Sequence, residues 1–336
     1  MSSIKYYVIT RIFLAIPMML ILLTIVFIVL RIMPGDPVTA MLGPKAPPSQ
    51  IQRMRTELGL NDPIPIQYVK YIGKLLVGNM GRSTLTERPV LTEILERFPA
   101  TLELTLYAMV VAVLIGIFWG AEAARRYDKI TDITARSYAI IIYSIPVFWF
   151  GMMMQLIFGV NLHWLPVSGR ISPMVEPTSI TRLYLIDSLI TGNWGSLWNA
   201  FRHILLPGTT LGLVISSIFV RMVRGNMLLT MNMDFVKAAR ARGIKERIVV
   251  YRHALKNAFV PILTIMGLQF ALLLAGAVLT ETTFSWPGIG SYLVMKIRYR
   301  DFAAIQGTIV FIAFFIIVVS ILIDVINAWI DPRIRY

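Results

Sequence analysis

Residues 307–330 read GTIVFIAFFIIVVSILIDVINAWI, and Asp324 is the one charged side chain among them. A membrane-spanning helix needs about 20 consecutive, predominantly apolar residues, so this run is long enough and apolar enough to cross a bilayer. Five runs of the same kind precede it, at about 12–30, 101–121, 137–160, 204–220 and 257–280. The sequence therefore predicts an all-α membrane protein with six spanning helices.

The composition of the whole chain agrees with a lipid environment. Of the 336 residues, 57% are hydrophobic and 15% are charged, whereas soluble domains have roughly 45–50% and about 25%. The net charge of +14 comes from basic residues in short segments between the apolar runs, as in cytoplasmic membrane loops rather than nucleic-acid-binding surfaces. The chain has no cysteine, which excludes disulfides, thiolate metal sites and cysteine nucleophiles.

Lysine and arginine are concentrated after the second and fourth apolar runs. The first of these loops carries Arg125, Arg126 and Lys129, and the second has a dense series of basic residues within about 221–256. Because basic residues in short loops are retained on the cytoplasmic side, we expect both loops and both termini to be cytoplasmic. Residues 34–100 then lie outside the cell membrane.

The outer segment contains signals for several short helices. Ser49–Gln52 has the spacing of a capping box, and Gly59 is placed to close the helix that follows. A second helix is expected over 66–77, ending at Gly78, and Pro89 is suited to the first turn of a third. We therefore divide the chain into an N-terminal transmembrane helix (1–33), an extracytoplasmic helical insertion (34–100) and a five-helix core (101–336).

The sequence lacks the residue patterns of an enzyme or a metal site. There is no P-loop, so the chain has no nucleotide site of that kind. His163, His203 and His253 are far apart in sequence, which disfavours a metal site. Charge within the spans is sparse, which weighs against a stand-alone secondary transporter or channel. Asp324 is the exception, and we expect it to pair with a basic residue or water near the cytoplasmic face.

The second basic loop contains DFVKAARARG, from Asp234 to Gly243. Helical spacing places Phe235, Ala238, Ala239 and Arg242 close to one stripe, and the small alanines allow close approach to another surface. Gly243 can adopt the left-handed conformation that ends a helix, and a second helical stretch at about 245–257 leads back to the membrane. The alternative is an ordinary basic loop lying on anionic headgroups.

This loop resembles the EAA loop of ABC-importer permeases, whose short helix docks in a groove of the ATP-binding subunit. Ala238, Ala239 and Gly243 match the E-A-A-x-x-x-G spacing, with Lys237 at the glutamate position and Pro261 farther downstream than in the generic pattern. Both departures are similar to those of the dipeptide/oligopeptide permease subfamily. The resemblance implies a coupling loop that contacts the ATPase through Asp234, Phe235, Ala238, Ala239, Arg240, Arg242 and Gly243.

The resemblance to this subfamily continues in order along nearly the whole chain. It covers MPGDP at 33–37, ELGL at 57–60, MGRS at 80–83, RFPAT at 97–101, IPVFW at 145–149, LPVSG at 165–169, ETTFSWPGIG at 281–290, RDF at 300–302 and DPR at 331–333. Each short motif is weak by itself, whereas the ordered set is specific. It implies the type I ABC-importer permease fold.

The resemblance also implies a set of partners in a prokaryotic cytoplasmic (inner) membrane. They are a second homologous permease, two ATP-binding subunits that hold ATP and Mg, and an extracytoplasmic substrate-binding protein. This chain itself then needs no cofactor. Peptides are the most common substrates in the subfamily, and nickel, glutathione and oligosaccharides are carried by close relatives. The residues do not decide between these substrates.

The segment after the fifth apolar run interrupts a helix where the chain re-approaches the membrane. Pro287, Gly288 and Gly290 follow Glu281 and Phe284 within ten positions of sequence. Irregular backbone at this level is tolerated when it is buried in protein or lines a cavity. We therefore expect these five residues to line the outer gate of a translocation path, with a plain reversing turn as the alternative.

Overall fold

The computed structural model describes residues 4–32, 38, 46–57, 59–275 and 277–330. The elements in these ranges are helices, and an isolated bridge joins Arg82 to Pro89. They are α1 (Ile4–Ile32), α3 (Pro48–Glu57), α4 (Ile64–Leu76), α5 (Val90–Arg125), α6 (Ile130–Ser144), α7 (Val147–Met154), the π-helical η1 (Gln155–Asn161), α8 (Tyr184–Ile190), α9 (Trp194–Met231), α10 (Asp234–Ala241), α11 (Glu246–Ile248), the π-helical η2 (Val249–Ala254), α12 (Leu255–Leu274), α13 (Val278–Thr283), α14 (Ile289–Arg298) and α15 (Phe302–Ile330).

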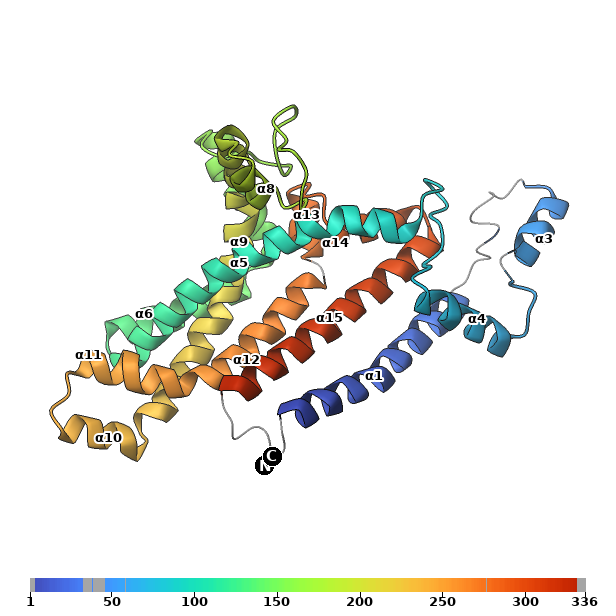
Figure 1. Cartoon of the computed structure of the whole chain (residues 1–336). Coiled ribbons are helices and arrows are strands. Elements are labelled where there is room, and N and C mark those ends of the chain that lie inside the picture. The colour runs from blue at the N-terminus through green and yellow to red at the C-terminus, as the bar shows by residue number, and fades with distance from the viewer. Residues whose placement is uncertain (1–3, 33–37, 39–45, 58, 276, 331–336) are drawn as a thin grey trace.

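The predicted spans are present in these helices. Five are long and apolar enough to cross a membrane, in α1, α5, α9, the continuous α11–η2–α12 segment and α15. The pair formed by α6 and α7–η1 makes a sixth span if it is counted as one, although it is bent by 99°. The α10 and α11 helices lie at one end of the bundle, called the α10 end below, and α13 and α14 lie toward the other (Figure 1).

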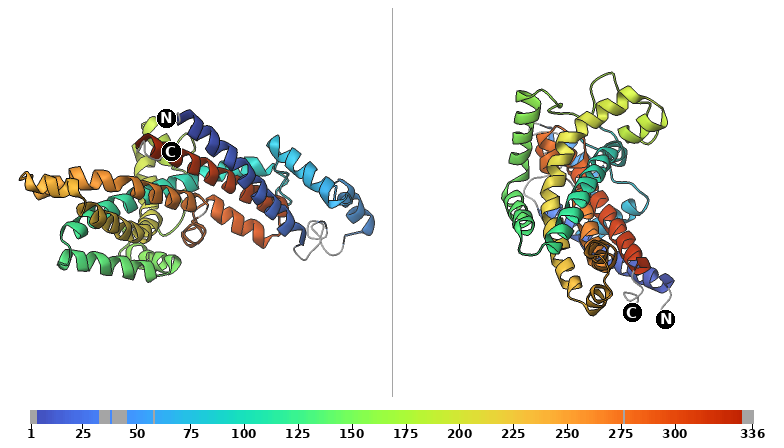
Figure 2. Two further views of the ribbon diagram at one scale, coloured as in Figure 1. Left: turned by 90° about the horizontal axis from the view of Figure 1, so that it is seen from below. Right: turned by 90° about the vertical axis from the view of Figure 1, so that its left-hand side faces the viewer.

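Helices α5 and α9 form the centre of the bundle and run in the same direction (Figures 1 and 2). Each carries two glycines four residues apart, and these glycines lie where the other helix approaches. A Cβ atom at Gly120 would lie 2.7 Å from Cβ of Val223, and one at Gly212 would lie 2.7 Å from Cβ of Val111. Small residues of this kind let helix backbones pack closely in a membrane. The α5–α9 pair is therefore the frame on which the other spans pack.

Helices α1 and α15 lie side by side along one edge of the bundle (Figure 1). Near the end of α15, Asp324 forms an ion pair with Arg11 of α1, with 3.2 Å between Oδ2 and Nε. The expectation that Asp324 pairs with a basic residue is confirmed. The pair lowers the cost of keeping an acidic residue in an apolar helix.

The described part of the chain between α1 and α5 contains the two short helices that the sequence predicts. Gly59 and Gly78 follow α3 and α4 with positive φ angles of 69° and 74°. The third expected helix is the start of α5, which continues without a break into the second span. Helix α4 rests on α1 through Tyr68, whose hydroxyl lies 2.7 Å from Oγ1 of Thr24.

Three of the family-like segments cannot be compared with the structure in full. The MPGDP segment at 33–37, Leu58 of the ELGL segment and the DPR segment at 331–333 lie outside the described residues.

Candidate functional site

The loop that joins α9 to α12 folds as a helical hairpin. Helix α10 ends at Ala241, and Gly243, two residues later, has a φ angle of 73°. The amide of Gly243 donates to the Arg240 carbonyl, and the amide of Ile244 donates to the Ala239 carbonyl. This is the hydrogen-bonding pattern of a helix ended by a left-handed residue, as the sequence predicts. The chain then returns to the membrane through α11, η2 and α12.

The inner face of α10 packs against its own chain. Val236 and Ala239 are buried, and the exposed fraction of Ala239 is 7%. They join Val249 and Val250 of η2 in a cluster, called the loop core below, that also includes residues of α5 and α9: Ala121, Ala124, Val223 and Met227. Helical spacing places Ala239 close to one stripe with Ala238, but in the structure Ala239 faces its own chain and Ala238 does not. The cause is the returning η2 segment, whose valines cover that side of α10.

The outer face of α10 is open. Phe235 is 40% exposed, and Asp234, Ala238 and Arg242 are exposed as well. Asp234 forms an exposed ion pair with Lys237, at 2.9 Å. A large aromatic residue beside a small alanine on a solvent-facing helix suits contact with another protein more than contact with water.

An ion pair ties α10 to α11, and a hydrogen bond ties η2 to the end of α5. The Arg240 guanidinium donates to the Glu246 carboxylate at 2.8 Å, and this hydrogen bond raises the pKa of Arg240. Glu122, near the end of α5, pairs with Arg126 at 2.7 Å and accepts a hydrogen bond from the Tyr251 hydroxyl at 3.0 Å. Together with the loop core, these contacts make α10, η2 and the ends of α5 and α9 one packed unit. A displacement of α10 would therefore be transmitted to the spans.

The predicted gate residues meet in the turn between α13 and α14. Glu281 is fully buried and accepts hydrogen bonds from the Thr101 hydroxyl at 2.6 Å and from the Ser291 amide at 2.8 Å. Thr101 in turn accepts from the Ile289 amide at 2.8 Å, so the two side chains satisfy the first amides of α14. Burial raises the pKa of Glu281, although its hydrogen bonds act in the opposite direction.

The two glycines of this turn make room for the Glu281 carboxylate. A Cβ atom at Gly288 would overlap the carboxyl group, and one at Gly290 would lie 3.0 Å from its Oε2 atom and 2.9 Å from Cα of Val278. A larger residue at Gly288 would have to displace the carboxylate, and one at Gly290 would have to displace the backbone at Val278. The Pro-Gly-Ile-Gly sequence is thus explained by the packing of a buried acid.

The same turn holds neighbouring segments together. The Trp286 indole is buried and donates to the Ala100 carbonyl of α5 at 2.8 Å. The Phe284 carbonyl accepts a hydrogen bond from the Gly169 amide at 2.9 Å. The Phe284 ring packs against Gly151 of α7, so closely that a Cβ atom on Gly151 would lie 2.9 Å from the ring. Pro287 is exposed. The five residues are therefore brought together, and their role in a gate stays a prediction.

A buried ionic cluster near this turn was not expected from the sequence. Lys296 is fully buried, and its Nζ atom lies 3.1 Å from Glu93, 3.1 Å from Asp301 and 2.5 Å from the Ser83 hydroxyl. The Tyr292 hydroxyl donates to Glu93 at 2.7 Å. These contacts join the loop before α5 to α14 and α15. Ser83 and Asp301 belong to the family-like segments MGRS and RDF, and this resemblance was the sole feature of the sequence that singled them out.

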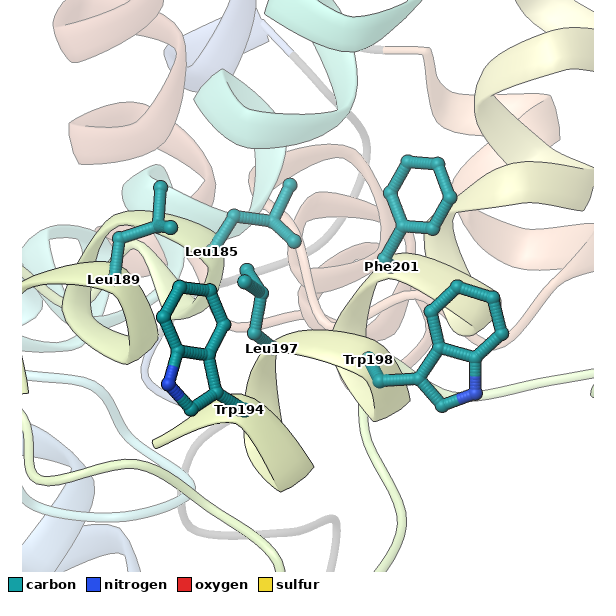
Figure 3. A pocket seen from close by; sticks show the side chains of 6 residues that line it. All are labelled: Leu185, Leu189, Trp194, Leu197, Trp198 and Phe201. Carbon is teal, nitrogen blue, oxygen red and sulfur yellow. The ribbon is translucent and has the colours of Figure 1, made fainter. Parts of the chain in front are cut away.

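A second unexpected ion pair supports the segment around α8. Arg170 and Glu103 are both buried and lie 2.7 Å apart, and the Arg170 guanidinium stacks on the Tyr184 ring at 3.9 Å. Beside them an apolar pocket of about 440 Å³ opens between α8 and the start of α9 (Figure 3). Its lining residues are Leu185, Leu189, Trp194, Leu197, Trp198 and Phe201. The exposed tryptophans are typical of a membrane–water interface.

The sequence as a whole matches one family of transport proteins. Residues 112–336 match the binding-protein-dependent transport system inner membrane component, and residues 4–105 match the N-terminal region of the same kind of membrane component. The two matches together cover nearly the whole chain.

Similar proteins of known name match along their full length. The dipeptide transport system permease protein DppB of Alkalihalophilus pseudofirmus is 38% identical over 98% of this chain and 99% of its own. The di/tripeptide transport system permease protein DppB of Pseudomonas aeruginosa is 40% identical, and the dipeptide transport system permease protein DppB of Escherichia coli K12 is 39% identical, each over 98% of both chains. The chain therefore belongs to the family of inner membrane components of binding-protein-dependent transport systems.

Proposed function

We propose that this chain is a permease subunit of an ATP-driven importer of dipeptides and other short peptides. The observation that carries the proposal is the α10 hairpin, which presents Phe235 and Ala238 outward while Val236 and Ala239 pack on the spans. A helix packed in this way can transmit a movement of a protein bound at its outer face to the membrane helices on its inner face. The peptide substrate is supported by the names of the full-length relatives.

The importer would contain several further subunits. Two ATP-binding subunits would each bind ATP and Mg, one of them holding α10 in a surface groove, and a second, homologous permease would complete the path. An extracytoplasmic binding protein would deliver the peptide. The absence of a P-loop from this sequence agrees with hydrolysis in other subunits.

The orientation follows from the distribution of basic residues. We place the α10 end in the cytoplasm, together with both termini, because the α10 hairpin is basic and packs against the end of α5, which carries Arg125 and Arg126. The α13–α14 turn then lies on the extracytoplasmic side, where Glu281 and Phe284 belong to the outer gate. Closure of the ATP-binding subunits would move α10, and through the loop core it would rock α5 and α9 so that the path opens outward.

Reconstituted transport tests this function. The chain is co-expressed with its second permease, the ATP-binding subunits and the binding protein, and the complex is placed in proteoliposomes. We expect uptake of labelled dipeptide that requires both ATP and the binding protein, and loss of uptake when the P-loop lysine of the ATP-binding subunits is replaced. Uptake driven by an ion gradient without ATP would contradict the proposal and favour a secondary transporter. ATP-driven uptake of nickel, glutathione or an oligosaccharide, without peptide uptake, would contradict the proposal that the substrate is a peptide.

A further inference from the structure

The third span is broken at membrane depth. Helix α6 ends at Ser144, and the chain turns by 99° at Ile145 and Pro146 before α7 begins. Its 15 residues place the break about 22 Å from the start of α6, at 1.5 Å per residue. Tyr143 and Trp149 on either side of the break are 57% and 46% exposed, so the described part of the chain leaves it uncovered. Irregular backbone at this depth must face protein or a water-filled cavity, not lipid.

An arginine of α9 lies against the last turn of α6, just before this break. The Arg221 guanidinium is 5.1 Å from the centroid of the Tyr143 ring. Arg221 is exposed, and none of the carboxylates in the described ranges forms an ion pair with it. Its neighbour Arg224, by contrast, pairs with buried Asp132. Arg221 directly follows the apolar run at 204–220 and lies ten residues, about 15 Å, before the end of α9. It is therefore a cation without a countercharge at the end of the apolar part of this span.

The open faces of the bundle differ in their charged residues: the α6–α9 face exposes apolar residues such as Ile140 and Ile141 together with Arg221, which is unpaired among the described residues. On α1 most of the exposed large side chains are apolar, as at Phe13, Met18 and Ile21, which suits lipid, and the exposed Arg11 is paired with Asp324. On α9 the open strip that begins at Arg221 forms a shallow groove of about 500 Å³. Its lining combines the polar residues Arg221, Asn226 and Asn232 with Met222, Leu228 and Leu229. Polar and charged residues in a span face the interior of an assembly or a water-filled path. The broken span and the uncompensated cation are thus two separate signs that the α6–α9 face is not exposed to lipid.

We propose that this face lines the translocation path and that Arg221, held on the Tyr143 ring beside the α6–α7 break, binds the carboxylate of the peptide in transit. The inference rests on the proposed function, since it takes a peptide as the substrate. A guanidinium presents two parallel N–H donors that fit a carboxylate, and a peptide with a free C-terminus carries that group whatever its side chains. Stacking on Tyr143 orients the cation without neutralising it. The exposed rings of Phe148 and Trp149 supply apolar surface near the same break.

Cysteine accessibility tests where Arg221 faces. The chain has no cysteine, so each variant carries a single thiol. Arg221→Cys is compared with Leu14→Cys, whose parent residue is 49% exposed on the apolar face of α1. In the assembled complex, a membrane-impermeant anionic thiosulfonate should label the cysteine of Arg221→Cys in at least one nucleotide state and leave that of Leu14→Cys unlabelled. Dipeptide supplied with the binding protein should slow the labelling. Absence of labelling in every nucleotide state would overturn the proposal.

Transport by charge variants tests what Arg221 does. In proteoliposomes, Arg221→Gln should reduce dipeptide uptake by about tenfold to hundredfold, the range for losing a hydrogen bond between charged groups. Arg221→Lys keeps the charge but not the parallel pair of N–H donors, so it should lose less uptake than Arg221→Gln and more than the native complex. Both variants should keep ATP hydrolysis that is stimulated by the loaded binding protein. Equal uptake by Arg221→Gln and the native complex would overturn this inference alone, as would equal losses in the two variants. A native complex that imports no dipeptide would overturn the proposed function instead.

Discussion

The same substitution to glutamate should destabilise the permease at one of two neighbouring alanines of α10 and weaken its association with the ATP-binding subunit at the other. Ala239 is 7% exposed and packs among Val236, Val249 and Val250. In Ala239→Glu the added volume costs about 1–3 kcal/mol, and burying a polar group without a partner adds about 2–7 kcal/mol. Since whole domains are stable by about 5–15 kcal/mol, the hairpin should unpack from the spans.

Ala238→Glu should leave the isolated permease intact. Ala238 is exposed in this chain, and substitutions at such surface positions usually change stability by no more than about 0.5 kcal/mol. If the outer face sits in a groove of the ATP-binding subunit, the same overpacking cost of about 1–3 kcal/mol appears there. This weakens the association by roughly fivefold to 150-fold.

The two effects are separated by measuring thermal unfolding of the purified permease pair and recovery of the ATP-binding subunits with it. Ala239→Glu should lower the unfolding temperature, and Ala238→Glu should reduce recovery of the ATP-binding subunits at an unchanged unfolding temperature. Each variant is the control for the other, because the two residues are adjacent on one helix. Full recovery and normal uptake with Ala238→Glu would refute the docking assignment, and an unchanged unfolding temperature with Ala239→Glu would refute the loop core.

Three further substitutions test the packing of the spans and of the α13–α14 turn. Gly120→Ile should prevent α5 from packing on α9, since a Cβ atom there lies 2.7 Å from Cβ of Val223, and size-exclusion chromatography should show loss of the assembled complex. Lys296→Met leaves two buried acids without their cation, which should cost about 3–5 kcal/mol and lower the unfolding temperature measurably. Because burial raises the pKa of Glu281, the protonated form is favoured in the fold, and its stabilisation should fade as the pH rises above the ordinary value of 4.5. The unfolding temperature of the native protein should therefore fall more steeply with pH than that of Glu281→Gln, and identical profiles would contradict this.

Features with local causes could be predicted from the sequence. The apolar runs identify the spans because a bilayer demands their length, and Gly59, Gly78 and Gly243 mark helix ends because each adopts a positive φ angle. The pairing of Asp324 could be predicted because an unpaired acid in an apolar span is costly. In each case the physical requirement involves the residue and its immediate neighbours in sequence.

Features that depend on distant contacts could not be predicted. Ala239 faces inward because Val249 and Val250 return across α10, and helical spacing alone does not say which side they cover. The Lys296 cluster joins Ser83 to residues more than 200 positions later, so no local pattern announces it. The proline after α6 signals an interruption, but not that the exposed Arg221 of another helix lies beside it.

A photo-crosslinking amino acid placed at position 238 tests the central claim most directly. The assembled complex is irradiated with the crosslinker in place of Ala238 and, separately, in place of Ala239, and the products are identified by mass spectrometry. The account predicts that position 238 crosslinks to an ATP-binding subunit, whereas position 239 crosslinks within this chain, to η2 or α9. Crosslinks from position 238 to lipid alone would contradict the account and would favour a basic loop that lies on anionic headgroups.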